Sequence, residues 1–179
     1  MQTDLIQRLD RPVPRYTSYP TAAQFRPGIG PGDQERWLGQ QAGRALALYL
    51  HVPFCQSLCH YCACHTAVVR DPAILASYAD AVATEAALLA PSLPEGLRWA
   101  ARQWGGGTPT QLGPASFLSL SRRLDRDFPL SDGAEHSVEL DPRAFDAALA
   151  DALAEAGVTR ASLGVQDFDP AVQQAIQRP

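Results

Sequence analysis

Residues 45–64 read ALALYLHVPFCQSLCHYCAC, and this stretch joins a short apolar run to all four cysteines of the chain. The apolar run ends at Pro53, which favours a strand that is buried on both faces. The thiols follow directly, within a ten-residue window, at Cys55, Cys59, Cys62 and Cys64. We therefore expect a buried strand that leads into a loop rich in soft metal ligands.

Three interpretations of these thiols are open. A reducing cytoplasm disfavours pairing them as structural disulfides, so metal or redox chemistry comes first. No second Cys or His pair follows at zinc-finger distance, which makes a closed tetrahedral zinc site awkward without excluding it. Iron-sulfur clusters take thiolates from one flexible loop, and the spacing favours this interpretation over zinc or inert thiols.

Outward from the cysteines, strand and helix patterns alternate four times. Alternation of this kind predicts an α/β fold with a parallel sheet built from right-handed crossovers. Before it, residues 1–35 are rich in Pro and Gly and predict an extended N-terminal arm that is not a domain, so we place the single domain at 36–179. Strands are expected at residues 45–52, 99–104, 137–141 and 160–166, and helices at 71–89, 114–127, 142–156 and from residue 170.

Special residues sit where each expected strand ends. The carboxyl ends of parallel strands share one face, where ligands bind in such folds, so these segments should converge. Besides the cysteine segment they include Gly105, Gly106 and Gly107, which let a ligand approach the backbone closely, although a tight turn would explain them too. Glu139 is the expected ligand contact of the third strand, and Asp141 the expected helix cap.

Two further polar residues are weighed in the same way. Gln166 offers a donor and an acceptor near a strand end, where it serves either a ligand or a satisfied buried amide. Arg178 could grip a carboxylate or simply be solvated. We expect none of the four histidines to be a metal ligand. His51 lies in the expected strand, His60 and His65 lie beside the cysteines, and His136 is expected at the surface.

Composition restricts the class of protein. The chain has 179 residues, 46% of them hydrophobic, and a formal net charge of -4, which fits a soluble globular domain and argues against a nucleic-acid partner. The first 15 residues lack an apolar segment, so we expect no secretory signal. The apolar run at residues 45–54 is about half of what crosses a bilayer. We therefore expect a cytoplasmic protein without a membrane span.

Taken together, the motifs resemble radical S-adenosylmethionine enzymes and, more narrowly, the oxygen-independent coproporphyrinogen III oxidase family. The resemblance rests on the segment from Tyr49 to Cys64 and on four further motifs in family order. These are PRYTSYP at residues 14–20, WGGGTPT at 104–110, ELDPR at 139–143 and LGVQDF at 163–168. The implied fold is a partial (β/α) radical-SAM barrel, about four βα units of a six-unit barrel, after an irregular N-terminal arm.

The resemblance also implies cofactors and site residues. Cys55, Cys59 and Cys62 would hold three irons of a [4Fe-4S] cluster, leaving the fourth iron for S-adenosyl-L-methionine, while Cys64 would not be a ligand. The implied contacts to this first S-adenosylmethionine are Tyr49, Tyr61, Gly106 and Glu139. Those to a second one are Gly107, Thr108, Gln166 and Arg178. No catalytic side chain is assigned, although Arg15 could meet a substrate propionate.

The implied reaction is oxidative decarboxylation of coproporphyrinogen III to protoporphyrinogen IX in haem biosynthesis, with an electron donor for the cluster as partner. Family members are more than twice this length, so we expect a truncated form that lacks a C-terminal half and has impaired turnover. Two alternatives are open: a non-catalytic Fe-S or haem-handling protein related to the haem chaperone, and a zinc-stabilised interaction module.

Overall fold

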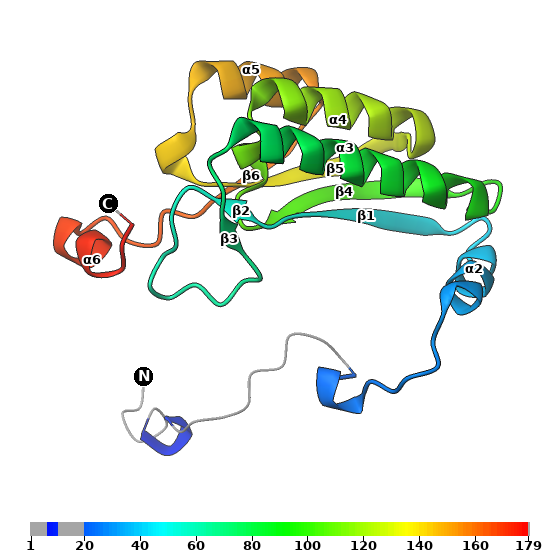
Figure 1. Ribbon diagram of the computed structural model, residues 1–179, viewed down its shortest axis with the longest axis horizontal. Coiled ribbons are helices and arrows are strands. Elements are labelled where there is room, and N and C mark those ends of the chain that lie inside the picture. Colours follow the sequence, from blue (N-terminus) through cyan, green and yellow to red (C-terminus); the bar gives the residue numbers. More distant parts are fainter. Residues whose placement is uncertain (1–6, 11–19, 179) are drawn as a thin grey trace. The chain divides into compact units, whose positions relative to one another are not determined.

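A computed structural model describes residues 7–10 and 20–178 of the chain (Figure 1). The chain divides into two compact units, residues 1–34 and 35–179. The described part of the first unit includes the short 3-10 helix η1 (Ala22–Gln24). Helix α2 (Pro31–Gly39) crosses residue 35, where the sequence places the end of the arm. Residues 14–19 of the arm motif, with Arg15, lie outside the described residues.

The second unit contains a four-stranded parallel sheet, which confirms the predicted α/β fold class. The strands lie in the order β1-β4-β5-β6, and every neighbouring pair is parallel. Their bounds are β1 (Ala45–Val52), β4 (Arg98–Gly106), β5 (Leu130–Leu140) and β6 (Arg160–Leu163). A second, two-stranded parallel pair joins β2 (Phe54–Cys55) to β3 (Ala67–Val68) and closes the loop at residues 55–66, hereafter the Cys loop.

Three helices cover one face of this sheet (Figure 1). They are α3 (Pro72–Leu89), α4 (Pro114–Asp127) and α5 (Ala147–Glu155), and α6 (Pro170–Ala175) follows the last strand. Short 3-10 helices lie between them: η2 (Ala90–Ser92), η3 (Pro109–Leu112) and η4 (Pro142–Ala144). The N-terminus of α3 follows from its sequence, because the Asp71 carboxylate accepts from the Ala73 N-H and Pro72 occupies the first turn.

Three expected bounds differ from the structure. Strand β5 begins at Leu130 instead of residue 137, because its polar first half carries no apolar alternation that would reveal a strand. Residues 142–144 form η4, so α5 begins only at Ala147, where Asp146 caps it. Strand β6 ends at Leu163 rather than at residue 166, which leaves Gln166 in a loop.

Burial of β1 corrects a further expectation. Leu50 and Val52 are 6% and 1% exposed, whereas Tyr49, which directly precedes Leu50, is 54% exposed. Alternate residues of a strand point to opposite faces, so one face of β1 packs against the helices and the other is open. The prediction of a strand buried on both faces is wrong, and the open face is where Tyr49 projects.

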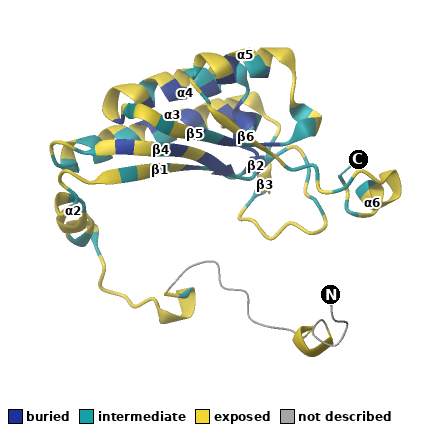
Figure 2. Ribbon diagram, turned by 180° about the vertical axis from the view of Figure 1, so that it is seen from behind, coloured by how far each residue is buried: buried dark blue, intermediate teal, exposed yellow. Residues whose placement is uncertain are grey.

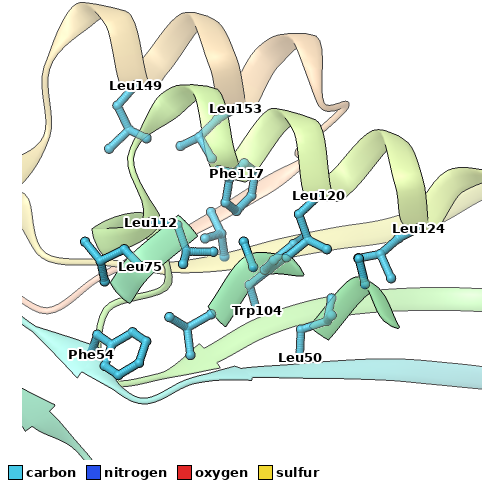
Figure 3. Close-up of a cluster of buried hydrophobic side chains, with 14 of the residues drawn as sticks. Leu50, Phe54, Leu75, Trp104, Leu112, Phe117, Leu120, Leu124, Leu149 and Leu153 are labelled. Carbon is cyan, nitrogen blue, oxygen red and sulfur yellow. The ribbon is translucent and has the colours of Figure 1, made fainter. Parts of the chain in front are cut away.

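The core lies between the sheet and the helices α3, α4 and α5 (Figure 2). The apolar side of α4 supplies Phe117, Leu120 and Leu124, all at most 2% exposed. Phe117 packs against the indole of Trp104 from β4, with ring centroids 4.5 Å apart (Figure 3). Burial of such an aromatic pair contributes several kcal/mol of stability, so this contact fixes the carboxyl half of β4 against the helices.

A polar network crosses the same core. The Trp104 indole N-H donates to Nε2 of His136 at 2.8 Å, and His136 is 1% exposed. The fully buried Arg102 donates to the Asp125 carboxylate at 2.7 Å and to the Phe128 carbonyl at 3.0 Å. His136 is therefore a core residue, and the expectation that it lies at the surface is wrong.

One helical stretch, Pro72–Ser92, is long and apolar enough to cross a membrane by length and composition alone. In this fold it belongs to α3 and η2, and it buries Leu75, Ala79 and Ala83 in the core of the second unit. A covering helix of a sheet meets the same length and composition test as a membrane span. Only 17% of the most apolar 18-residue segment of this stretch is buried within the structure, and Ile74 and Leu88 are exposed.

The buried imidazole predicts how folding stability depends on pH. Burial, and secondarily the charge of Arg102, lower the pKa of His136 from 6.5 to about 4. Below pH 6.5 the unfolded chain takes up a proton that the folded chain refuses, so stability falls as the pH drops from 6.5 toward 4. The full loss is about 3 kcal/mol.

Urea unfolding at pH 7 and pH 5 measures this loss. We expect His136→Gln to flatten the pH dependence, because glutamine keeps an acceptor for Trp104 but does not titrate. His65→Gln, which changes an exposed ring, should retain the slope of the unmodified chain. An equal slope in the unmodified chain and in His136→Gln would contradict the assignment.

Candidate functional site

A cavity of about 220 Å³ opens at the carboxyl ends of the strands. The Cys loop, the end of β4, the end of β5 and the segment after β6 all contribute to its wall. Among its lining residues are the three expected cluster ligands, Cys55, Cys59 and Cys62, and seven of the eight expected cofactor contacts, Tyr61, Gly106, Gly107, Thr108, Glu139, Gln166 and Arg178. Segments far apart in the sequence thus meet in one pocket.

Tyr49 is the expected contact that does not line this cavity. It lies near the lining residue Glu139, since a Cβ atom at Gly105 would lie 3.0 Å from the Tyr49 ring and 3.2 Å from the Glu139 carboxylate. Burial and the Glu139 carboxylate both raise the pKa of the Tyr49 phenol. The phenol also shares a 3.2 Å hydrogen bond with Nδ1 of His51, whose Nε2 lies 3.2 Å from the His65 carbonyl. On the other side, Glu139 accepts the Gly106 backbone N-H at 3.3 Å.

The base of the Cys loop is closed by backbone hydrogen bonds. The Ala67 N-H donates to the Pro53 carbonyl at 2.7 Å, and the Val69 N-H donates to the Cys55 carbonyl at 3.2 Å. The guanidinium of Arg70 adds two bonds to the Gln56 carbonyl, at 3.0 and 2.8 Å. The loop can therefore project its thiols from a fixed base.

No disulfide joins the four cysteines, and their thiols differ in environment. Burial raises the pKa of Cys55, and the neighbouring thiols Cys62 and Cys59 raise it further, against a hydrogen bond from Thr108 at 3.6 Å. Cys62 is exposed, and the backbone N-H of Cys64 is the main cause that lowers its pKa. These sulfurs are close enough to influence one another's ionisation.

Among the residues that the structure describes, no three His, Cys, Asp or Glu side chains converge on a point where one metal ion would be held. The thiols instead spread around the pocket wall. A single tetrahedral ion requires its ligands to converge, whereas a compact cluster presents several irons to separate thiolates. The thiols that line this cavity are soft donors, which are suitable ligands for zinc and for iron-sulfur clusters alike.

Gly107 brings two parts of this wall together. A Cβ atom at this position would lie 2.8 Å from the Phe54 carbonyl oxygen and 2.9 Å from the Cys55 sulfur. The Gly107 N-H donates to the Val52 carbonyl, and the Thr108 N-H donates to the Phe54 carbonyl, both at 2.8 Å. Only a residue without a side chain allows the end of β4 to pack this closely on Cys55.

The segment after β5 carries an acidic residue with two arginine partners. Asp141 caps η4 by accepting the Arg143 N-H at 3.1 Å, as the sequence predicts, and it pairs with the Arg143 guanidinium at 2.7 Å. Its second partner is Arg178, at 3.5 Å. Burial alone would raise the pKa of Asp141, but the hydrogen bonds from Arg143 and the charge of both arginines lower it.

Sequence reasoning missed the ion pair of Arg143 with the lining residue Asp141. Ser162 also lines the cavity, and it pairs in register with Glu139 across β5 and β6. Strand alternation at residues 160–163 could have identified it. Gln166 has a φ of 72°, a left-handed conformation that costs energy for a residue with a side chain, and no local sequence signal announces it.

These features define a class: a parallel α/β protein with a thiolate-lined cofactor pocket at the carboxyl ends of its strands. Residues 49–179 match the family described as the Radical SAM superfamily, and the chain belongs to this superfamily. Membership implies a [4Fe-4S] cluster and S-adenosylmethionine as cofactors. The implied partial barrel agrees with the four-stranded parallel sheet observed here.

Individual relatives are similar over nearly the whole chain. The chain is 48% identical over 179 residues to an oxygen-independent coproporphyrinogen III oxidase of Paracoccus denitrificans, covering 99% of this chain and 40% of that protein. It is 42% identical to one from Pseudomonas aeruginosa. A solved coproporphyrinogen III oxidase from Escherichia coli, described as a radical SAM enzyme, superposes with a TM-score of 0.86 at 38% identity and covers 92% of this chain.

The chain is shorter than these relatives. It spans about 40% of the length of the curated relatives that it matches, and 38% of the solved structure.

Close packing at Gly107 generates a prediction. Gly107→Ala should destabilise the fold by about 1–3 kcal/mol and reduce the iron bound after anaerobic reconstitution, because the added methyl group displaces Cys55 or the end of β4. Urea unfolding and iron analysis measure the two effects. Gly39→Ala is the matched control, since a Cβ there meets no atom within 4 Å. Equal iron content in both variants would show that the approach at Gly107 is not required.

Proposed function

We propose that this chain contributes to the oxygen-independent decarboxylation of coproporphyrinogen III to protoporphyrinogen IX. The observation that carries the proposal is the meeting of all four cysteine thiols with the ends of β4, β5 and β6 in one pocket. It is supported by the names of relatives that are 48% and 42% identical to this chain. The proposed substrate is coproporphyrinogen III, and the proposed location is the cytoplasm, where thiols stay reduced.

We assign the cluster to Cys55, Cys59 and Cys62 and leave Cys64 outside the ligand set. When bound, the cluster and S-adenosylmethionine would supply reductive one-electron radical chemistry directed at a substrate propionate. An external electron donor is therefore a required partner. The protein's own part is to hold these groups and to exclude water from a reactive radical.

We assign residues in or beside the pocket to the binding of two S-adenosylmethionine molecules. Glu139 already accepts the Gly106 N-H, and its carboxylate can accept further hydrogen bonds from a ligand ammonium or hydroxyl group. Tyr49 and Tyr61 flank the same region with aromatic surface. We assign these four residues to the first S-adenosylmethionine, and Gly107, Thr108, Gln166 and Arg178 to a second. Arg178 is suited to pair with a ligand carboxylate.

The described part of the second unit leaves one face of the sheet without a covering helix (Figure 1), and the edge strand β6 is exposed at all four residues. We therefore assign cofactor binding to the chain and propose that efficient turnover requires further polypeptide. Such a complement would cover the open face and supply the remaining substrate contacts.

Serine substitutions test the ligand set. After anaerobic reconstitution, Cys55→Ser, Cys59→Ser and Cys62→Ser should each lower bound iron and 5'-deoxyadenosine formation about tenfold or more, because a hydroxyl is a poor ligand for iron in such clusters. Cys64→Ser is the matched control and should retain both. Iron and sulfide analysis and a reductive cleavage assay measure the outcome.

Other results would favour the two alternatives. Haem binding without any cleavage of S-adenosylmethionine would identify a non-catalytic haem-handling protein. A colourless product that contains zinc, and that loses it equally in all four variants, would identify a zinc-stabilised interaction module.

A further inference from the structure

The Cys loop is attached to the segment that follows β6 through a histidine. His60 lies directly after Cys59, and its backbone N-H donates to the Ile176 carbonyl at 3.1 Å. Nδ1 of its ring lies 3.0 Å from the Ala175 carbonyl oxygen. Because a carbonyl oxygen only accepts, Nδ1 carries the proton in this contact. One residue of the loop thus makes two hydrogen bonds to consecutive carbonyls.

Those carbonyls are available because α6 ends there. The Arg178 N-H donates to the Gln173 carbonyl at 2.7 Å and the Gln177 N-H donates to the Gln174 carbonyl at 3.1 Å, which is the hydrogen-bond pattern of a Schellman motif. Gln177 takes the left-handed conformation that this motif requires, with a φ of 57°. The last carbonyls of a helix lack hydrogen-bond donors within the helix. His60 supplies a donor to each of the Ala175 and Ile176 carbonyls.

The same turn directs Arg178 back to the neighbouring cysteine. Its Nη1 donates to the Cys59 sulfur at 3.2 Å, and its Nε donates to the Gly164 carbonyl at 2.6 Å. A Cβ at Gly164 would lie 2.8 Å from the Arg178 guanidinium, so glycine is what permits this approach. Cys59 and His60, adjacent in the loop, are therefore both bound by the end of α6, which lies with the loop at the carboxyl end of the sheet (Figure 1).

We propose that His60 is a positioning residue that latches the Cys loop to the C-terminus of α6. It acts through Cys59 and Arg178: the latch keeps the thiol and the guanidinium on the same wall of the pocket. The role of the latch in cofactor binding rests on the proposed function. The hydrogen bonds themselves do not, because they join residues of the chain itself. Since α6 follows Gln166, the latch also links the Cys loop to the wall formed after β6.

The test uses hydrogen exchange in the metal-free full chain. His60→Gln should speed exchange in the peptides covering residues 56–66 and 170–178 about two- to tenfold, as expected for loss of one hydrogen bond. His60→Asn should restore the exchange rate of the unmodified chain, because its amide nitrogen is attached to Cγ as Nδ1 is in histidine. The matched control is His65→Gln. Among the hydrogen bonds of the described residues, the His65 ring makes none to α6.

After reconstitution, iron loss to a chelator gives the second readout. It should be faster in His60→Gln than in His60→Asn or the unmodified chain, by a similar factor. Unchanged exchange in His60→Gln, or faster exchange in His60→Asn as well, would overturn the latch. A chain that shows the exchange pattern but fails to cleave S-adenosylmethionine would overturn the proposed function and leave the latch in place.

Discussion

Parallel pairing of β1, β4, β5 and β6 is the constraint on which the site depends. Strands that run in one direction end on one edge, so the segments that follow them share a wall even though they span residues 55–178. No one of these features defines a site by itself: neither the thiols, nor the close approach at Gly107, nor the acidic residues at the end of β5. Their common edge converts them into a single pocket.

The two faces of the sheet have different tasks. The helix-covered face holds the apolar core and the buried polar network of Arg102, Trp104 and His136, which fixes β4 and β5 in register with α4. The open face carries Tyr49 and Glu139 beside the pocket. Rigid packing on one face therefore positions the proposed ligand contacts on the other.

Sequence reasoning predicted the parallel fold because alternating apolar runs and capped helices carry strong local signals, such as Asp71 and Pro72 at the start of α3. It also brought Cys55, Glu139 and Gln166 to one edge, since the parallel topology requires this. It failed where no local signal exists: the polar first half of β5, the open face of β1 and the burial of His136. The His60 latch depends on a partner more than a hundred residues away.

The most direct test is the electron paramagnetic resonance spectrum of the anaerobically reconstituted and reduced chain, recorded with and without S-adenosylmethionine. A pocket with three thiolates and one free iron position predicts a [4Fe-4S] signal that changes when S-adenosylmethionine is added. A signal indifferent to S-adenosylmethionine, or a chain that binds zinc in place of iron and sulfide, would contradict the account.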